Sequence, residues 1–365
     1  MVSFEEKLKL KLMASGIDIS SKAKNKLTEG GKIPLSILDA PTTSGIYLQF
    51  KGKDIFVNTP YRLRELKDEK PFLDLVNNNY IIREGEKETI VEPICPDIEL
   101  LGINNKGIAF SEIVMIQLDR IRINPISGCA YNCKFCELNP KQYKKHELNE
   151  IFEATDLALR AKENSTIPVR HILIGAGTPI KPDRAHQDLV IRKVIEKYGD
   201  YLSIDLMVAP FFDNSYLRTL KDYGVREISL NLEVFNKKIA QKIMPQKFAL
   251  GQDRYLKSLE EAVGYFGYGN VRSMLVVGLE PIESTLEGVK ELARRNVLPV
   301  LSPFTTMEGI QMENYPTPSL ETLLEVYKRS QEIVSKYKTH LGPKCIPCQN
   351  NVITFPDNSN FYKYA

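Results

Sequence analysis

Apolar and polar residues follow two different periods along most of this chain. Short runs rich in Ile, Leu and Val are typical of buried strands, and they occur at residues 120–126, 170–174, 202–208, 227–234, 271–277 and 297–303. After each run, apolar residues recur at helical spacing, for the last time over residues 320–337. Six strand and helix pairs in succession indicate parallel strands joined by helices. We therefore predict an α/β fold, a partial (β/α)6 barrel, with active groups on the loops that follow the strands.

The pattern differs on both sides of this region. Residues 1–95 contain a helical stretch at 4–13 and two strand-like runs, 45–50 and 54–58, around a turn at Gly52. We expect a small α+β extension there, then the barrel over residues 96–307. Residues 308–365 are expected to hold a long helix and a cysteine-containing tail.

Local signals predict where two of the helices begin. Ser284 and Glu287 have the spacing of a capping box, and Thr317 places a hydroxyl before Pro318. These signals predict helix starts near residues 284 and 317.

Composition excludes several classes of protein. The apolar share is 43% and the charged share 26%, so disorder is not indicated. The formal net charge of +3 is too small to favour nucleic-acid binding. No run is apolar and long enough to span a membrane, and the first residues lack a secretory pattern. We expect a cytoplasmic protein without a membrane or nucleic-acid partner.

Three cysteines stand close together directly after the first predicted strand. Cys129, Cys133 and Cys136 have the spacing C-x3-C-x2-C. Thiolates bind iron–sulfur clusters, and three of them leave one iron of a cubane open to another ligand. A closed zinc site needs four ligands, and His146 is the one histidine nearby. A zinc site and three unrelated core cysteines are the alternatives.

This loop resembles the signature of the radical S-adenosylmethionine (SAM) superfamily, including the aromatic Phe135 beside the last cysteine. The resemblance implies a partial barrel and a [4Fe-4S] cluster on the three cysteines, which would be catalytic. SAM would bind the open iron, and its reductive cleavage would give a 5'-deoxyadenosyl radical. A low-potential electron donor such as a ferredoxin would be a partner.

Further candidates for the SAM pocket follow from their place in such a barrel. Gly175, Gly177 and Thr178 come after the second strand and resemble the motif that receives the amino group of SAM, although the acidic residue usual in that motif is absent. Asn231 and Glu233 share one face of the fourth strand, and a buried Glu233 would need a donor such as a ribose hydroxyl. The alternative is that these residues face helices or solvent.

The later strands supply the remaining candidates. Gly278 resembles the glycine that lies beneath the adenine, and Ser302 would lie beside it. Glu280 could serve the cofactor or act as a cap or salt-bridge partner. Arg254 and Arg272 are candidate partners of the methionine carboxylate, because a guanidinium grips a carboxylate through two hydrogen bonds.

The other three cysteines, Cys95, Cys345 and Cys348, predict a second metal site if they converge. An auxiliary [4Fe-4S] cluster would fit them, with a vacant or noncysteine fourth position. A redox-inert cysteine pair with one core cysteine, and a zinc site completed by His340, are the alternatives.

A closer resemblance suggests one reaction. Residues 342–351, Cys95 and the strand at 231–233 are similar to archaeal two-component lipoyl synthase subunits, which are biotin-synthase-like radical SAM proteins. That resemblance implies sulfur insertion into the octanoyl chain of a lipoyl carrier protein, together with a sister radical SAM subunit. The alternatives are a radical SAM lyase, cyclase or mutase of cofactor biosynthesis, and a noncatalytic electron-transfer or RNA-binding module.

Overall fold

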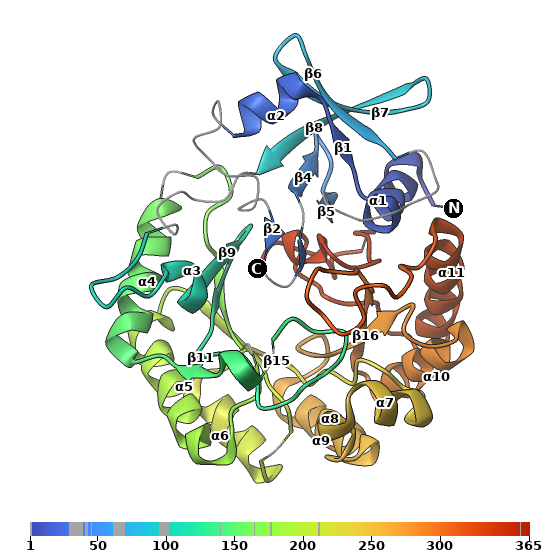
Figure 1. Cartoon of the computed structure of the whole chain (residues 1–365). Helices are drawn as coiled ribbons and strands as arrows, with labels where there is room; N and C mark the ends of the chain where they lie inside the picture. Colours follow the sequence, from blue (N-terminus) through green and yellow to red (C-terminus); the bar gives the residue numbers. More distant parts are fainter. Residues whose placement is uncertain are drawn as a thin grey trace.

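A curved sheet of seven strands forms the centre of the protein (Figure 1). The computed structural model describes residues 2–28, 39–40, 43–44, 46–60, 70–94, 102–138, 140–163, 165–175, 177–210, 212–357 and 359–365. In spatial order the strands are β17 (Leu298–Pro303), β16 (Val271–Val277), β15 (Glu227–Ser229), β14 (Ser203–Met207), β13 (His171–Ile174), β10 (Arg120–Ile123) and β9 (Val114–Gln117). All neighbours run parallel except β9, which pairs antiparallel with β10.

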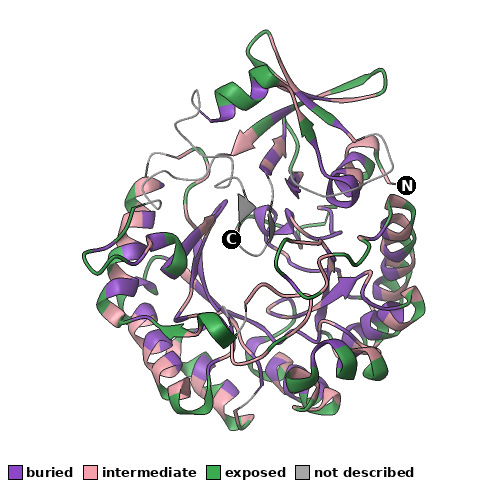
Figure 2. Ribbon diagram, viewed as in Figure 1, coloured by how far each residue is buried: buried purple, intermediate pink, exposed green. Residues whose placement is uncertain are grey.

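Helices cover the outer face of this sheet, so that the strands form the buried inner layer (Figure 2). The six long helices are α4 (Leu148–Ala161), α5 (Arg184–Tyr198), α6 (Ser215–Tyr223), α9 (Gln252–Phe266), α10 (Ile282–Ala293) and α11 (Leu320–Lys336). Each buries an apolar face, as α10 does with Leu286, Val289 and Leu292. The predicted partial (β/α)6 barrel is confirmed, with strands shorter than expected.

Both predicted caps are wrong, although α11 begins at Leu320, as its helical pattern predicts. Helix α10 begins at Ile282, after Pro281 in an extended conformation, so Ser284 lies within the first turn. Its hydroxyl accepts a hydrogen bond from the Asn236 amide instead of capping the helix. Helix α11 begins after Ser319, whose hydroxyl accepts from the N–H of Thr322 at 3.2 Å.

A second sheet precedes the barrel, in the order β1 (Asp18–Ile19), β6 (Phe72–Val76), β7 (Asn79–Glu84), β8 (Lys87–Ile94), β4 (Ile46–Phe50) and β5 (Phe56–Thr59). The predicted hairpin is present as β4 and β5, with Gly52 at a positive φ in the turn. Helix α1 (Phe4–Ser15) packs against β5 and α11, and α2 (Ser21–Leu27) packs against β6.

Shorter elements connect these parts. They are β2 (Asp39–Ala40), β3 (Thr43–Ser44), α3 (Phe110–Ile113), β11 (Ile126–Ser127), β12 (Lys144–Lys145), α7 (Lys237–Ile243), α8 (Pro245–Phe248) and the 3-10 turns η4 (Pro140–Gln142), η5 (Lys181–Asp183) and η6 (Pro347–Gln349). Among the helices described, none has the length and apolar character needed to cross a bilayer.

The tail, residues 338–365, lies along the free edge of β17. Gly342 bridges to Val300, and the N–H of Ile353 donates to the carbonyl of Leu301 at 2.9 Å. On its other side, Ile346 and Tyr362 pack in one apolar cluster with Leu118, which lies in the turn between β9 and β10. The tail therefore spans the gap between the two edge strands of the open barrel.

Candidate active site

The loop of three cysteines leaves the barrel at the carboxyl end of β10. Gly128 has a φ of 69°, which lets the chain turn sharply before Cys129. The sulfur of Cys129 accepts hydrogen bonds from the N–H groups of Tyr131 at 3.3 Å and Thr178 at 3.1 Å. Such N–H donors stabilise a thiolate and tune the potential of a bound cluster.

The glycine-containing loop after β13 approaches the cysteine loop so closely that only glycine fits. A Cβ on Gly177 would lie 1.8 Å from the carbonyl oxygen of Gly128, and one on Gly175 would lie 2.4 Å from that of Met207. The N–H of Ala130 donates to the carbonyl of Thr178 at 2.8 Å. The two loops predicted to serve one cofactor therefore touch through their backbones.

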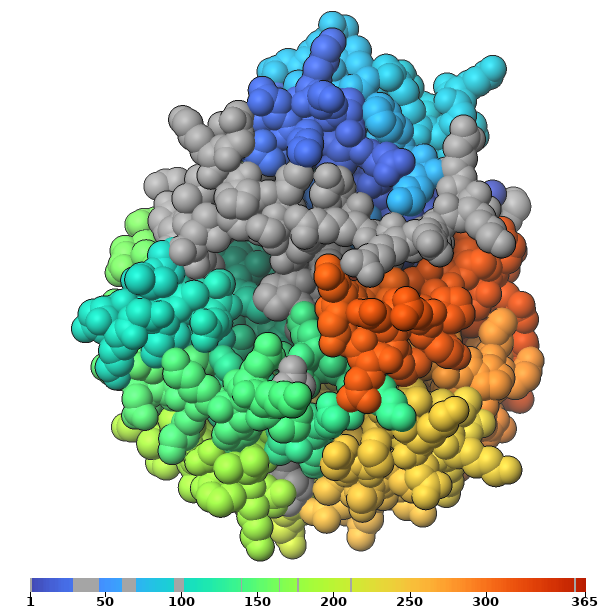
Figure 3. All heavy atoms as spheres, viewed as in Figure 1, coloured from blue at the N-terminus to red at the C-terminus, as the bar shows by residue number. Residues whose placement is uncertain are grey.

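The rest of the cysteine loop is anchored in an apolar cluster. Phe135 and Cys133 pack against it. The N–H of Lys134 donates to the carbonyl of Ile243 at 2.8 Å, and the carbonyl of Lys134 accepts from the N–H of Met312 at 3.2 Å. Figure 3 shows the loop beside the segment near residue 312, in green and orange. Burial raises the pKa of Cys133 to about 12 and that of Cys136 to about 11.

These observations fit an iron–sulfur cluster. Half-buried thiols with a raised pKa stay protonated until a metal replaces the protons, so metal binding would release the protons. Three sulfur ligands come from one loop, and a glycine-lined backbone closes on it. Cys129, Cys133 and Cys136 would hold the cluster and leave one corner for a nonprotein ligand.

A cavity of about 340 Å³ runs inward from this loop. Its described lining contains Cys136 and seven of the predicted SAM-binding candidates, namely Phe135, Gly177, Thr178, Asn231, Glu233, Arg272 and Ser302. The alternation along the fourth strand thus places its polar residues toward the interior. Their roles as cofactor ligands stay predictions.

Glu233 has a partner that the sequence did not suggest. Its carboxylate accepts from the ammonium of Lys247 at 2.9 Å, where a ribose hydroxyl was expected as the donor. Burial alone would lower the pKa of Lys247, but Glu233, Tyr255 and Cys133 together outweigh burial and raise it. Glu233 also has a φ of 65°, and such left-handed backbone in a residue other than glycine is concentrated at functional sites.

Arg254, Gly278 and Glu280 are not among the described lining residues of the cavity. The exposed Arg254 donates to the carbonyl of Phe212 at 2.7 Å, so its placement contradicts a contact with SAM in this cavity. Gly278 has a φ of 101°, and a Cβ there would lie 3.0 Å from the ring of Pro318.

Glu280 acts as a structural brace. Its buried carboxylate accepts from the N–H of Asn236 at 2.6 Å and of Phe235 at 3.0 Å, and from the Thr285 hydroxyl at 3.2 Å. It therefore supports the start of α7, which is the capping role that the sequence left open beside a cofactor contact.

Sequence reasoning missed the basic side of the cavity. Arg120 and Arg122 alternate along β10 and both line the cavity, as does Glu137 beside the last cysteine of the loop. Burial and the neighbouring Arg120 lower the pKa of Arg122 to about 10, while burial raises the pKa of Glu137 to about 8. Polar residues at alternate positions of a strand inside a barrel are the signal that could have revealed the arginines.

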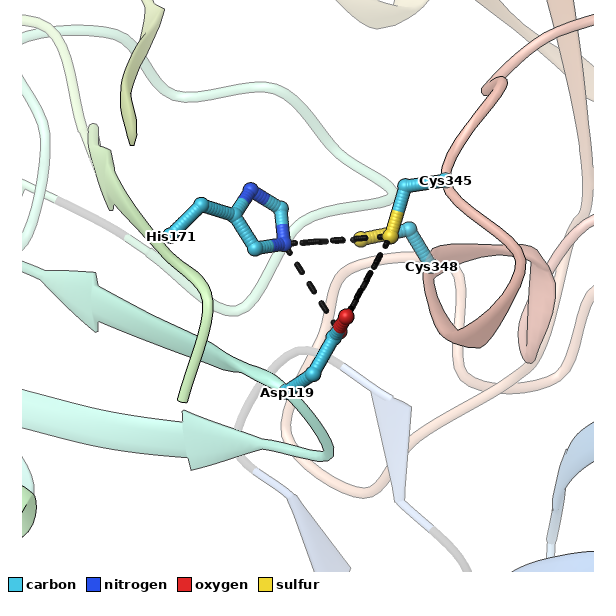
Figure 4. Close-up of side chains that lie close together, drawn as sticks. All are labelled: Asp119, His171, Cys345 and Cys348. Carbon is cyan, nitrogen blue, oxygen red and sulfur yellow. Dashed lines mark hydrogen bonds and ion pairs between the residues drawn. The ribbon is translucent and has the colours of Figure 1, made fainter. Parts of the chain in front are cut away.

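Cys345 and Cys348 lie at the opposite end of the barrel from the cysteine loop, near the amino ends of the strands. There they meet Asp119 and His171, and the ligand atoms of all four residues lie within 4.8 Å of one another (Figure 4). Cys348 also lines the cavity. Cys95, the third member of the expected cluster, falls outside the described residues.

The zinc site completed by His340 is wrong. The ring of His340 stacks on Phe361 at 3.9 Å between centroids, and its Nδ1 forms a hydrogen bond with the Tyr268 hydroxyl. Its side chain is therefore occupied by the tail and does not belong to the four-residue group.

Comparisons with known proteins agree with this site. Residues 123–295 match the model of the Radical SAM superfamily. Two similar proteins are bacteriochlorophyllide c C-7(1)-hydroxylase of Chlorobaculum limnaeum, 26% identical over 62% of this chain, and GTP 3',8-cyclase of Nautilia profundicola, 28% identical over 40% of it. The alignments span 62% and 44% of those two proteins.

A crystal structure supports the fold alone. It is that of a radical SAM methyltransferase from Sphaerobacter thermophilus, which is 15% identical, with a TM-score of 0.50 and 72% of each chain covered. The closer resemblance to lipoyl synthase subunits stays a hypothesis, because the two similar proteins are a hydroxylase and a cyclase. The cysteine loop, the barrel and the matched residues together show that this chain contains a radical SAM domain.

Proposed function

We propose that this protein is a radical SAM enzyme that removes a hydrogen atom from an acidic organic substrate held inside the barrel. The observation that carries the proposal is the single cavity that joins the cysteine loop to a basic interior. When bound, a [4Fe-4S] cluster and SAM would supply the 5'-deoxyadenosyl radical that takes the hydrogen.

The chain's own residues provide position and shielding. Phe135 and the apolar cluster behind it exclude water next to the cysteines. The Lys247 and Glu233 pair is fixed in the wall beside the place where SAM would lie, and Thr178 is held against Cys129. Rigid walls of this kind keep the reacting carbon close to the radical.

The charges of the cavity favour an acid as substrate. Among the described lining residues, Arg120, Arg122, Lys247 and Arg272 are cationic, whereas Glu137 and Glu233 are acidic. Lys247 is paired with Glu233, and Arg272 with Glu227 outside the lining, so Arg120 and Arg122 against Glu137 leave the net charge of the lining positive. A carboxylate or phosphate near Arg120 and Arg122 would offset the repulsion between two neighbouring guanidinium groups. By its name, the relative that is a GTP cyclase acts on such an anionic molecule.

Formation of 5'-deoxyadenosine tests the first part of this proposal. The anaerobically reconstituted protein, given SAM and a strong reductant, should release 5'-deoxyadenosine. Small molecules from an anaerobic cell extract, separated by anion exchange, should stimulate this release in the anionic fraction.

Two arginine variants test the substrate class. Arg120→Gln should lower the stimulation by about 10-fold or more, because it removes a charge-assisted contact. Arg254→Gln, an exposed arginine outside the cavity lining, is the matched control and should respond like the wild type. Stimulation by neutral molecules alone would contradict an acidic substrate.

Sulfur insertion into an octanoyl chain is a second candidate. In its favour, Cys348 lines the same cavity as Cys136, so the second cysteine pair faces the space in which the substrate would react. The basic lining speaks against an apolar octanoyl chain. The reconstituted protein should be incubated with an octanoyl-lysyl peptide, with and without a sister radical SAM subunit, and 5'-deoxyadenosine without a thiolated product would reject this candidate.

A reducing compartment suits either reaction. Five described cysteines are free thiols, three of them in the loop that would hold an oxygen-sensitive cluster. We therefore propose a cytoplasmic enzyme that receives electrons from a ferredoxin-like donor, and reduction by such a donor in place of a chemical reductant would test this.

A further inference from the structure

We propose that Asp119, His171, Cys345 and Cys348 bind a single zinc ion that fastens the C-terminal tail to the first strands of the barrel. The four side chains come from three distant parts of the sequence and converge in Figure 4 on one point. This inference is independent of the proposed reaction, and its failure would leave that proposal untouched.

The distances match one tetrahedral metal ion. His171 Nε2 lies 3.4 Å from the sulfur of Cys348, 3.8 Å from that of Cys345 and 3.7 Å from Asp119 Oδ1. The sulfur of Cys345 is 3.8 Å from either carboxylate oxygen of Asp119. Zinc bonds of about 2.0–2.3 Å in tetrahedral geometry put neighbouring ligand atoms about 3.3–3.8 Å apart. A cubane has eight atoms to place between its ligands and would hold them farther apart than this group allows.

The orientation of His171 is the one that a metal ligand requires. Its Nδ1 faces Asp205 Oδ2 at 2.7 Å, so in the neutral ring Nδ1–H donates to that carboxylate and Nε2 carries the lone pair. A carboxylate behind a ligating histidine is a recurring feature of zinc sites, because it fixes the tautomer and raises the basicity of the ring. Nε2 then points at two sulfurs and a carboxylate, which are all electron-pair donors, and a cation between them would hold them together.

The surroundings balance the charge of such a site. Zinc bound by two thiolates, one carboxylate and a neutral histidine carries a net charge of −1, and binding releases the two thiol protons. Arg120 Nη1 lies 3.6 Å from the sulfur of Cys348, and Arg170 Nη1 lies 3.5 Å from Asp119 Oδ2. Each arginine thus supports one ligand from outside.

Burial adds a further argument. All four residues are buried, with Asp119 and His171 at 0% and 2% exposure. Buried carboxylates and thiolates are costly unless they are paired or bound to metal. Four protein ligands without an open position are typical of structural zinc, so we assign this site to the architecture of the barrel.

The site lies where the barrel needs closing. β17 and β9 are the two edge strands of the sheet, and the tail forms a β-bridge with β17. Asp119 lies in the turn between β9 and β10, on the other side of the gap. A zinc ion shared by Asp119 and Cys345 would therefore join the two edges and fix the end of the cavity lined by Cys348.

Metal analysis of the full chain purified under anaerobic conditions tests the proposal. The wild type should contain about one zinc per chain besides the iron of the cluster. His171→Ala should lose the zinc and keep the iron, whereas Cys129→Ala with Cys133→Ala should lose the iron and keep the zinc. His340→Ala, in the same tail but outside the group, is the control and should keep both.

Two further measurements do not depend on the folding of the His171 variant. Wild-type protein loaded with Co²⁺ should show the absorption bands of tetrahedral cobalt with thiolate ligands. Asp205→Asn should weaken zinc binding by about 10- to 100-fold in competition with a chelator, because it changes only the group behind His171. Wild-type protein without zinc, or iron that depends on Cys345 and Cys348, would overturn the assignment.

Discussion

The two ends of the cavity use cysteine in opposite ways. At the carboxyl end of the strands, Cys129, Cys133 and Cys136 come from one loop and would leave a metal corner open. At the amino end, Cys345 and Cys348 meet Asp119 and His171 from distant segments and complete a set of four. Open sites suit chemistry and closed sites suit architecture. A local loop can thus provide a reactive site, while the closed site depends on the whole fold.

The largest expected effect comes from Cys133→Ala, which should remove one metal and leave the other in place. Cys133→Ala removes one of three cluster ligands, so we expect SAM cleavage to fall to background and the iron content with it. Zinc should be unchanged, because the second site lies at the other end of the barrel. Loss of both metals in this variant, as measured by elemental analysis, would show that the two ends are not independent.

The ion pair between Lys247 and Glu233 in the cavity wall allows a second test, at the carboxyl end of the strands. Lys247→Met leaves the Glu233 carboxylate without its ammonium partner, and breaking a buried pair costs about 3 kcal/mol or more of unfolding free energy. Thermal unfolding should show this loss. The double variant Lys247→Met with Glu233→Gln should recover part of it, and equal losses in the single and double variants would contradict a coupled pair.

The contact between the two loops is tested by adding one methyl group. Gly177→Ala would place a Cβ 1.8 Å from the Gly128 carbonyl, so the loops must separate. A displacement of about 1 Å near reacting groups can lower a rate about 100-fold, and we expect that loss in SAM cleavage.

Gly264→Ala is the matched control for this substitution. Gly264 lies in α9, and a Cβ added there would have no neighbouring atom within 4 Å. The variant should therefore keep its activity and gain slightly in stability. If Gly177→Ala behaved in the same way, the close approach of the loops would be unimportant for catalysis.

The smallest expected effect comes from Lys9 of α1, which contacts the C-terminal tail. Lys9 is buried and donates to the carbonyls of Gln349 at 2.6 Å and Thr354 at 3.1 Å. Burial lowers its pKa to about 7 from the model-peptide value of 10.5. Between these two values the unfolded chain binds more protons than the folded one, so stability should rise with pH.

Lys9→Met removes the ammonium group, so it should also remove this pH dependence of the unfolding free energy. From pH 7 to 9 the wild type should gain about 2 kcal/mol of unfolding free energy relative to Lys9→Met. Paired thermal unfolding at the two pH values measures this difference. A wild type that lost stability relative to the variant over this range would contradict the assignment of Lys9.

Sequence patterns predicted the parts of the fold that depend on nearby residues. The six parallel strands, their helices and the cysteine loop follow from periodicity and from one short motif. The role of Glu280 stayed open in the sequence because a carboxylate after a strand can equally brace the next helix, as its bonds to Asn236 and Phe235 show. Local sequence propensity could not decide between those two roles of Glu280, because tertiary contacts decide between them.

The second site could not be predicted because its members are far apart in sequence. Cys345 lies 226 residues after Asp119 and 174 after His171, and no spacing rule connects them. A polar residue at the start of a buried strand, as His171 is in β13, was the available signal. The Glu233 and Lys247 pair was missed for a similar reason, because the turn through α7 and α8 brings them together.

Cys348 lies late in the sequence, and this position affects the order in which the two metal sites can form during synthesis. The ribosome makes the strands and the cysteine loop long before it makes the tail, so the growing barrel cannot yet be closed across its gap. During that interval the cavity lined by Cys136 would stay open on the side that Cys348 later lines, which would leave the cysteine loop accessible from within the barrel. We expect cluster insertion to be easiest in the nascent chain and to become slower once the tail has docked.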